Sequence, residues 1–301
     1  MRNIVVVGLG EALFDVLPDI KKVGGAPANF AFHASQLGLE SYVVSACGND
    51  ASGDELLDKL TKRGLNLMIS RVDFPTGEVQ VTFKSPTEPQ YNIVEGSAWD
   101  NIPYTKEMEA LAKKTDAVCF GSLAQRNDVS YKSIHQFIND IENKDALKIF
   151  DINLRQHFYS RKVIDKSLEM CNVLKINDDE IGVLCDLYGI ERIDVFNNAE
   201  VEALARRIIE KYSLKYMIVT CGSVCSYIVT PTEFNREETP RVEVVDAVGA
   251  GDSFTATFCT AILRGKDIRT AHKLAVDVAA EVCKSEGAMP LLSESLKSRL
   301  Y

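Results

Sequence analysis

An acid and two glycines stand close together in the segment D246-A247-V248-G249-A250-G251-D252, directly before an apolar run that is typical of a helix. Glycine lets the backbone adopt unusual conformations and lets a ligand approach closely. The first amides of a helix attract negative charge, so this turn predicts an anion-binding site. Asp252 would repel a bound phosphate unless its carboxylate accepts a proton from the hydroxyl group that attacks that phosphate. The alternative is an ordinary first-turn acid after a tight turn.

A second glycine pair opens another predicted helix, in the segment G24-G25-A26-P27-A28-N29-F30-A31. Pro27 suits a first helical position, and the glycines permit close ligand approach or a hinge. Asn29 offers both a donor and an acceptor, which is suitable for a polyol. The alternative is a capped helix after a flexible turn.

The elements that would carry these turns alternate along the chain. Buried strands are predicted at 4–8, 42–46, 117–121, 148–152, 173–176 and 216–220. Helices are predicted near 27–38, 52–63, 129–142, 161–170, 199–212, 249–263 and 269–285. This alternation predicts an α/β fold with a mostly parallel sheet covered by helices on both faces, and ligands of such sheets bind beyond the carboxyl ends of the strands.

Two stretches add to this pattern. Residues 242–245, directly before the acidic glycine turn, are predicted to form a strand. Between about residues 70 and 97, alternating apolar and polar positions predict an antiparallel hairpin, which residues 11–17 are expected to join. We expect a small β lid over the site, and a single main domain over residues 1–301.

Composition limits the class of function. The chain has 301 residues, is 46% hydrophobic and carries a net charge of -9, and it has no apolar run long enough to cross a bilayer. The negative charge argues against nucleic-acid or membrane partners, and we expect a cytoplasmic protein with small-molecule partners. The eight cysteines lie mostly in apolar runs and are expected to be reduced, and the isolated histidines argue against zinc.

Together these segments resemble the ribokinase-like (PfkB) family of sugar kinases, whose signatures are a GG-x-x-x-N helix start and a D-x-x-GAGD segment. Three further segments match in order: G48-N49-D50-A51-S52-G53, K175-I176-N177-D178-D179-E180 and T220-C221-G222. The resemblance covers nearly the whole chain and implies the three-layer ribokinase-like fold. Within the family, the chain looks most like fructokinases in G10-E11-A12-L13-F14-D15, GGAPANFA, A98-W99-D100 and D151-I152-N153-L154-R155.

The resemblance implies a role for each matching position. Asp252 would take the proton from a sugar hydroxyl. The transferring phosphoryl group would be stabilised by the amides of Gly249, Ala250, Gly251 and Asp252. Sugar hydroxyls would be held by Asp15, Gly24, Gly25 and Asn29. Arg155 would contact sugar or phosphate, although a surface ion pair explains it nearly as well.

The same resemblance implies ATP and Mg²⁺. Asn177 and Glu180 would place magnesium and phosphates through water, and the alternative for this pair is an ordinary helix N-terminus. Thr220 and Gly222 would belong to the nucleotide loop, in which Cys225 replaces the usual last glycine. K⁺ is an expected activator, held by Asp246, Val248, Val282, Ser285 and Gly287, mostly through backbone carbonyls.

The expected reaction is therefore phosphorylation of free D-fructose to fructose 6-phosphate by ATP, and a homodimer is compatible with it. A 2-keto-3-deoxygluconate kinase or a ribokinase of the same family is the alternative. A different class, an NAD-dependent Rossmann oxidoreductase, would need a helix after V7-G8-L9-G10-E11-A12-L13, where the third glycine is missing. No P-loop motif occurs.

Overall fold

A mostly parallel sheet forms the centre of the molecule in the computed structural model, which describes residues 3–17, 20–85 and 88–300. Among these residues, nine strands form the main sheet, in the spatial order β13 (Phe234–Glu238), β12 (Cys225–Val229), β11 (Tyr216–Cys221), β10 (Val173–Asn177), β9 (Leu147–Asp151), β8 (Ala117–Gly121), β1 (Val5–Leu9), β4 (Glu40–Gly48) and β5 (Asn66–Val72). Only the pairs of β12 with β11 and with β13 are antiparallel in this described sheet. The predicted fold class is confirmed.

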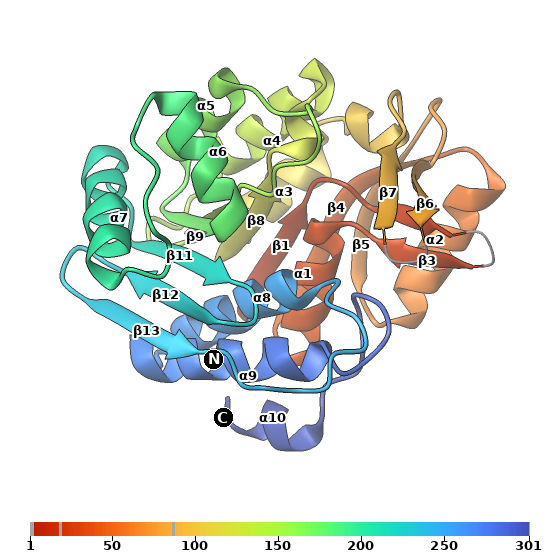
Figure 1. Ribbon diagram of the computed structural model, residues 1–301. Coiled ribbons are helices and arrows are strands. Elements are labelled where there is room, and N and C mark those ends of the chain that lie inside the picture. The colour runs from red at the N-terminus through yellow and green to blue at the C-terminus, as the bar shows by residue number, and fades with distance from the viewer. Residues whose placement is uncertain (1–2, 18–19, 86–87, 301) are drawn as a thin grey trace.

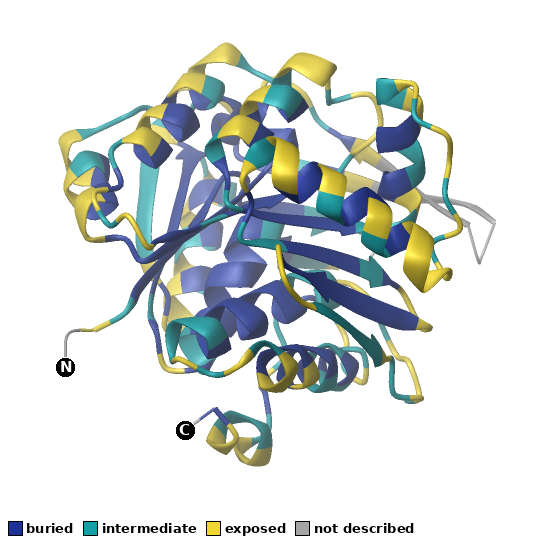
Figure 2. Ribbon diagram, turned by 90° about the vertical axis from the view of Figure 1, so that its left-hand side faces the viewer, coloured by how far each residue is buried: buried dark blue, intermediate teal, exposed yellow. Residues whose placement is uncertain are grey.

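Helices cover both faces of this sheet, as Figure 1 shows. The helices are α1 (Ala26–Gln36), α2 (Ala51–Lys62), α3 (Lys106–Lys114), α4 (Asp128–Asn139), α5 (Arg161–Met170), α6 (Asp178–Tyr188), α7 (Asn198–Tyr212), α8 (Ala250–Leu263), α9 (Ile268–Val282) and α10 (Glu294–Ser298). One apolar core joins α3 to α7 with one sheet face, and a second joins α1, α8 and α9 with the other. Their buried sides face the sheet and their exposed sides face outward (Figure 2), as expected for amphipathic helices.

A second, four-stranded sheet lies beside the main one within the described residues. Its order is β3 (Lys21–Gly24), β2 (Leu13–Val16), β6 (Gly77–Ser85) and β7 (Glu88–Ile93). β6 and β7 form the predicted antiparallel hairpin, and β2 joins β6 in parallel. Residues 70–72 belong instead to β5 of the main sheet. That this small sheet is a lid over the site stays a prediction.

The inner parallel strands were predicted well because each is a short, β-branched, buried run. The strand predicted at 242–245 is wrong: these residues form an irregular connection in which Val244 and Val245 are each 59% exposed. A β-branched run forms a strand only where a neighbour offers backbone partners, and here Val245 N donates to Cys283 O, beyond the end of α9.

Two general features of the chain follow from the packing. Within the described ranges, no helix is long and apolar enough to span a membrane. All eight cysteines are free thiols, and every one except the partly exposed Cys283 is buried. Small apolar thiols of this kind pack like other core residues.

Candidate active site

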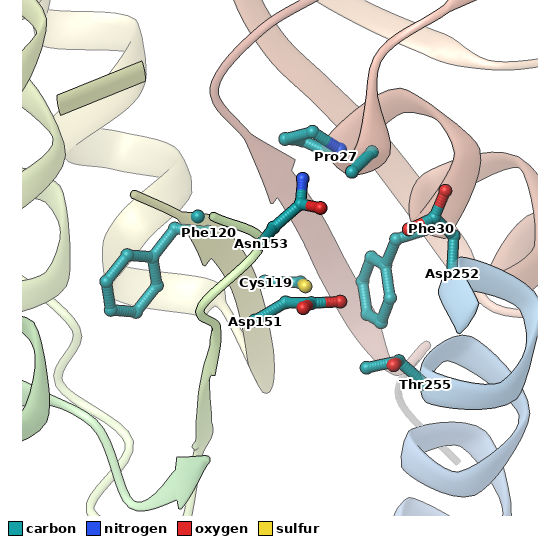
Figure 3. Close-up of a pocket in the computed structure, with 10 residues that line it drawn as sticks. Pro27, Phe30, Cys119, Phe120, Asp151, Asn153, Asp252 and Thr255 are labelled. Carbon is teal, nitrogen blue, oxygen red and sulfur yellow. The ribbon is translucent and has the colours of Figure 1, made fainter. Parts of the chain in front are cut away.

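A pocket lies where the central strands end. β1, β8, β9 and β10 run parallel, so their carboxyl ends meet at one edge of the sheet. The pocket is lined by Ala26, Pro27, Phe30, Cys119, Phe120, Gly121, Asp151, Asn153, Asp252 and Thr255. Figure 3 shows Asp151 and Asn153 at the end of β9, across from Phe30 and Asp252. The two glycine turns singled out in the sequence therefore meet at this edge, at the starts of α1 and α8.

The turn before α8 has the backbone shape that its glycines predict. Gly249 is the N-cap residue with φ 81°, a left-handed conformation that favours glycine. A side chain there would also collide with the next segment, because a Cβ atom would lie 2.6 Å from Ala288 O. No side chain of the described residues caps this helix, so its first amides lack a side-chain capping group. Ala250 N donates weakly, at 3.3 Å, to Ala247 O within the turn.

Asp252 lies in the first turn of α8 and contacts the other glycine motif. Its Oδ2 accepts a hydrogen bond of 2.7 Å from Nδ2 of Asn29, which lies 223 positions away in the sequence. Asn29 is buried, and its Oδ1 has no partner among the described residues. Burial, followed by the negative charge of Asp151, raises the pKa of Asp252 to about 6, against the opposing effects of Asn29, Lys175 and Arg155. A carboxylate with this pKa is ionised at neutral pH and can accept a proton.

The predicted sugar-binding residues lie on the second sheet and at its junction with α1. Asp15 on β2 lies opposite Lys22 on the antiparallel neighbour β3. If Gly24 carried a Cβ atom, that atom would lie only 2.4 Å from Oδ2 of Asp15. Gly25 is the N-cap residue of α1 with φ 110°, and a Cβ there would collide with Glu11 O at 2.3 Å. Close contacts therefore leave no room for a side chain at either glycine, and at Gly25 the backbone conformation also favours glycine.

Arg155 is exposed, just beyond the end of β9. Burial raises the pKa of Asp15 to about 6, and the positive charge of Arg155 is the main opposing effect. The same guanidinium lowers the pKa of Glu11 and of Asp252. Its positive charge therefore acts on three acids of the candidate site, and a role for Arg155 in binding sugar or phosphate stays a prediction.

Three charged residues were missed as candidates. Glu11 is 2% exposed, and burial raises its pKa to about 7. Asp151 and Lys175 are also buried, and they form an ion pair with a distance of 3.1 Å between Oδ1 and Nζ. The sequence contained a signal for one of these residues, because Lys175 interrupts an otherwise apolar predicted strand, V173-L174-K175-I176. Buried charges of this kind concentrate at functional sites.

The residues predicted for the nucleotide lie on the next two strands. Asn177 and Glu180 form a capping box at the start of α6, in which each side chain accepts from the backbone amide of the other. The second carboxylate oxygen of Glu180 accepts from Leu154 N. Thr220 is the neighbour of Asn177 on β11, and Gly222 follows with φ 49°. These contacts are those of an ordinary helix N-terminus, which was the alternative interpretation of this pair. The carboxylate of Glu180 also connects the segment after β9 with the start of α6.

The residues predicted for a monovalent cation lie on two neighbouring segments. Asp246 accepts from Val248 N through Oδ1 and from Gly287 N through Oδ2. Val282 O accepts from Ser285 N at the end of α9. The carboxylate thus holds the segment before α8 against residues 285–287. Within the described residues, no cluster of three His, Cys, Asp or Glu side chains could hold a metal ion, so a cation here would depend on backbone carbonyls.

Comparison with known proteins identifies the family. A family model described as pfkB family carbohydrate kinase matches residues 20–295. The ATP-dependent 6-phosphofructokinase of Thermoanaerobacterium thermosaccharolyticum is 28% identical over 275 residues, covering 89% of this chain and 81% of that protein. The nucleoside kinase of Methanothermobacter thermautotrophicus is 27% identical over 281 residues, covering 91% and 83%. The crystal structure of fructokinase with bound ATP from Xylella fastidiosa superposes with a TM-score of 0.85 at 20% identity, covering 98% of this chain and 97% of that one. With most of its length matched by the family model, this chain belongs to the pfkB family of carbohydrate kinases.

Proposed function

We propose that this carbohydrate kinase transfers the γ-phosphoryl group of ATP to O6 of free D-fructose, with Asp252 as the general base. The observation that carries the proposal is the 2.7 Å contact between Asn29 and Asp252. It brings a polyol-binding amide to a carboxylate at a glycine-shaped helix N-terminus, so one hydroxyl can be held, deprotonated and aimed at a phosphate in the same place.

The acceptor is proposed from the polar groups on the sugar side. Asn29 Oδ1 is a buried acceptor without a partner in the described chain, and Asp15 has a carboxylate that can accept from two adjacent hydroxyls. A neutral polyol suits these groups better than an acidic sugar, which would need fixed cations. Arg155 is such a cation, so a 2-keto-3-deoxygluconate kinase is the alternative within the family.

The nucleotide is proposed to bind across the ends of β10 and β11, with its γ-phosphate at the turn before α8. Gly249, Ala250, Gly251 and Asp252 would contribute their amides, and Thr220 and Gly222 would form the nucleotide loop. Glu180 already accepts from two backbone amides, so it would act on Mg²⁺ through water rather than by direct coordination. K⁺ would bind beside Asp246 and stimulate turnover.

An oxidoreductase of the Rossmann type is disfavoured by the local fold. After β1 the chain enters β2 rather than a helix, so the helix N-terminus that binds a dinucleotide pyrophosphate is missing at that place in the described chain.

The test is a panel of acceptors with purified protein, ATP and Mg²⁺: fructose, ribose, adenosine, tagatose, 2-keto-3-deoxygluconate and fructose 6-phosphate. We expect the highest kcat/KM with fructose and a 6-phosphate product by ³¹P and ¹³C NMR. A preference for the keto acid, for fructose 6-phosphate or for adenosine would overturn the fructose assignment and leave the kinase reaction intact. Absence of nucleotide turnover with every acceptor would overturn the proposed reaction itself.

A further inference from the structure

A buried lysine lies directly behind the proposed phosphoryl-transfer turn. Lys175 is the third residue of β10 and is 7% exposed. Its Nζ atom lies 3.1 Å from Oδ1 of Asp151, at the end of the neighbouring strand β9, and both side chains are almost completely buried. A buried pair of this kind is costly to form, which argues that the fold retains it for a specific purpose.

The ammonium group of this pair reaches the first turn of α8. A Cβ atom built on Gly251 would lie 3.2 Å from Lys175 Nζ. Asp151 lines the same pocket as Asp252 (Figure 3). The pair therefore lies next to the first turn of α8 and beside the pocket that the proposed base also lines.

The charges around this group come from each element that packs against it. Asp151, Glu180 and Asp252 together hold the pKa of Lys175 above its ordinary value, although burial acts in the opposite direction. On the neighbouring strand β8, burial keeps the pKa of Cys119 far above its usual range, so that thiol is neutral. Asn29 and Arg155 act on Asp252 from α1 and from the end of β9. The buried carboxyl of Glu11, after β1, interacts with Asp252 by charge repulsion.

We propose that Lys175 and Asp151 form a buried charge pair that sets the ionisation of Asp252, which makes Lys175 a positioning residue for the proton transfer. The proposal rests on the role of Asp252 given above. The negative charge of Asp151 favours the protonated form of Asp252, and the positive charge of Lys175 favours its carboxylate. Because the two charges oppose one another, losing either one alone shifts the balance between the protonated acid and the carboxylate of Asp252.

This opposition predicts two shifts of opposite sign. Lys175→Met leaves Asp151 uncompensated, so the acidic limb of the kcat/KM profile should move up by about one pH unit or more. Asp151→Asn removes the repelling charge, so the limb should move down by a similar amount. The double variant loses both charges and should return close to the parent limb.

The measurements are pH–rate profiles together with a ¹³C NMR titration of labelled aspartate carboxyls, in which the Asp252 signal is assigned by its loss in Asp252→Asn. Lys148→Met is the matched control, because Lys148 is a partly buried lysine on the adjacent strand β9 whose pKa is lowered by burial. It should leave both the pH–rate limb and the NMR midpoint unchanged. Circular dichroism checks that each variant is folded.

The proposal is overturned if neither single variant moves the midpoint, if both move it in the same direction, or if the double variant does not return the midpoint to near the parent value. If Lys175→Met does not fold, the midpoints of Asp151→Asn and of the double variant still test the predicted downward shift and the predicted return to the parent value. The NMR midpoints require no kinase activity, so a failure of the proposed function is distinguishable from a failure of the charge pair.

Discussion

Asp252 occupies an environment that raises its proton affinity without preventing its ionisation at neutral pH. Burial and Asp151 raise its pKa to about 6, while Asn29 stabilises the carboxylate by a hydrogen bond. A general base is most effective when its pKa is close to the working pH, because it is then both ionised and basic. The rate should therefore fall as the pH decreases through about 6.

Asp252→Asn should lower kcat by about 100-fold or more and leave the fold and sugar binding nearly intact, because asparagine keeps the shape but cannot accept the proton. Steady-state kinetics and calorimetric titration with the sugar measure the two effects. Asp128→Asn is the control, since Asp128 is another first-turn helix acid, on the exposed surface of α4. Near-parental turnover in Asp252→Asn would contradict the assignment of the base.

Glu11 gives a prediction about stability. Burial raises its pKa from 4.5 to about 7. Because the pKa of Glu11 is higher in the folded state than in the unfolded state, the protonated acid contributes its full stabilisation below about pH 4.5. This contribution to the free energy of unfolding is lost as the pH rises from about 4.5 to about 7. The change corresponds to roughly 3 kcal/mol of unfolding free energy.

Glu11→Gln resembles the protonated acid, so the variant should lose less stability than the parent between pH 5 and pH 8. Urea unfolding at several pH values measures this difference. Glu233→Gln, at a surface position with an exposed carboxyl, should leave the slope of stability against pH unchanged. Equal slopes for the parent and Glu11→Gln would mean that Glu11 ionises at its ordinary pKa.

At the residue scale, the sequence was sufficient where a local motif determines the backbone conformation. Asp252, Asn29 and the glycines at 25 and 249 stand in short patterns whose backbone requirements can be reasoned out. Lys175 and Asp151 could not be placed in the same way, since their pairing depends on the register of two strands that are separated in sequence.

At the scale of elements, helix α1 connects the two halves of the site. Asn29 contacts Asp252, and one turn later Nε2 of the buried His33 donates to Ala288 O at 2.9 Å. Gln36 donates to Pro290 O and accepts from Leu292 N. We name residues 285–292 the C-terminal strap. The strap packs against Gly249, so α1 supports the turn before α8 through the strap.

His33→Ala should therefore lower kcat more than it raises the sugar KM, and it should cost about 1–3 kcal/mol of stability. His33→Gln should recover much of the turnover, because its amide can donate to the same carbonyl. Kinetics and urea unfolding measure these effects. His272→Ala is the matched control, as His272 is equally buried but bonds to Ser226 and Asn235. Equal kinetic losses in both alanine variants would indicate a general packing defect.

Prediction of the elements succeeded in the interior and failed at the periphery. Of the buried parallel strands, β8 is apolar along its whole length and β10 is apolar apart from Lys175 and Asn177, so pattern alone identifies them. The edge strand β13, F234-N235-R236-E237-E238, is polar and was not predicted. Its conformation is imposed by pairing with β12, which no local pattern records.

At the scale of the whole molecule, one buried arginine joins the second sheet to the body. Arg126 makes a bidentate pair with Asp100 and donates to Val94 O, directly after β7. Its guanidinium stacks on Trp99 and Phe158. A lid that moved as a rigid sheet would have to turn about this junction.

Arg126→Met should reduce the unfolding free energy by about 3–5 kcal/mol, because it leaves the carboxylate of Asp100 buried and unpaired. Lys62→Met is the matched control: Lys62 and Asp58 form an exposed i,i+4 pair, and such pairs contribute about 0–1 kcal/mol. Urea unfolding compares the two. A loss below 1 kcal/mol in Arg126→Met would show that the pair does not hold the junction together.

The layered architecture followed from the alternation of strands and helices, and the family resemblance gave the same result. The way in which the small sheet joins the main body could not be predicted from the sequence. A98-W99-D100 was noticed only as a family likeness, whereas its packing partner Arg126 lies in a segment that no motif marked. Contacts of this kind are set by tertiary packing, which sequence spacing does not encode.

The contact of α1 with the C-terminal strap has a consequence for biosynthesis. A ribosome makes α1 early, yet His33 cannot meet Ala288 until 255 further positions have been translated. Until then the chain contains α1 but lacks Ala288, which packs against both His33 and Gly249 in the folded protein. A message cut short before the codons for the strap would yield a protein with most of its core but without this contact, and we expect such a protein to be inactive.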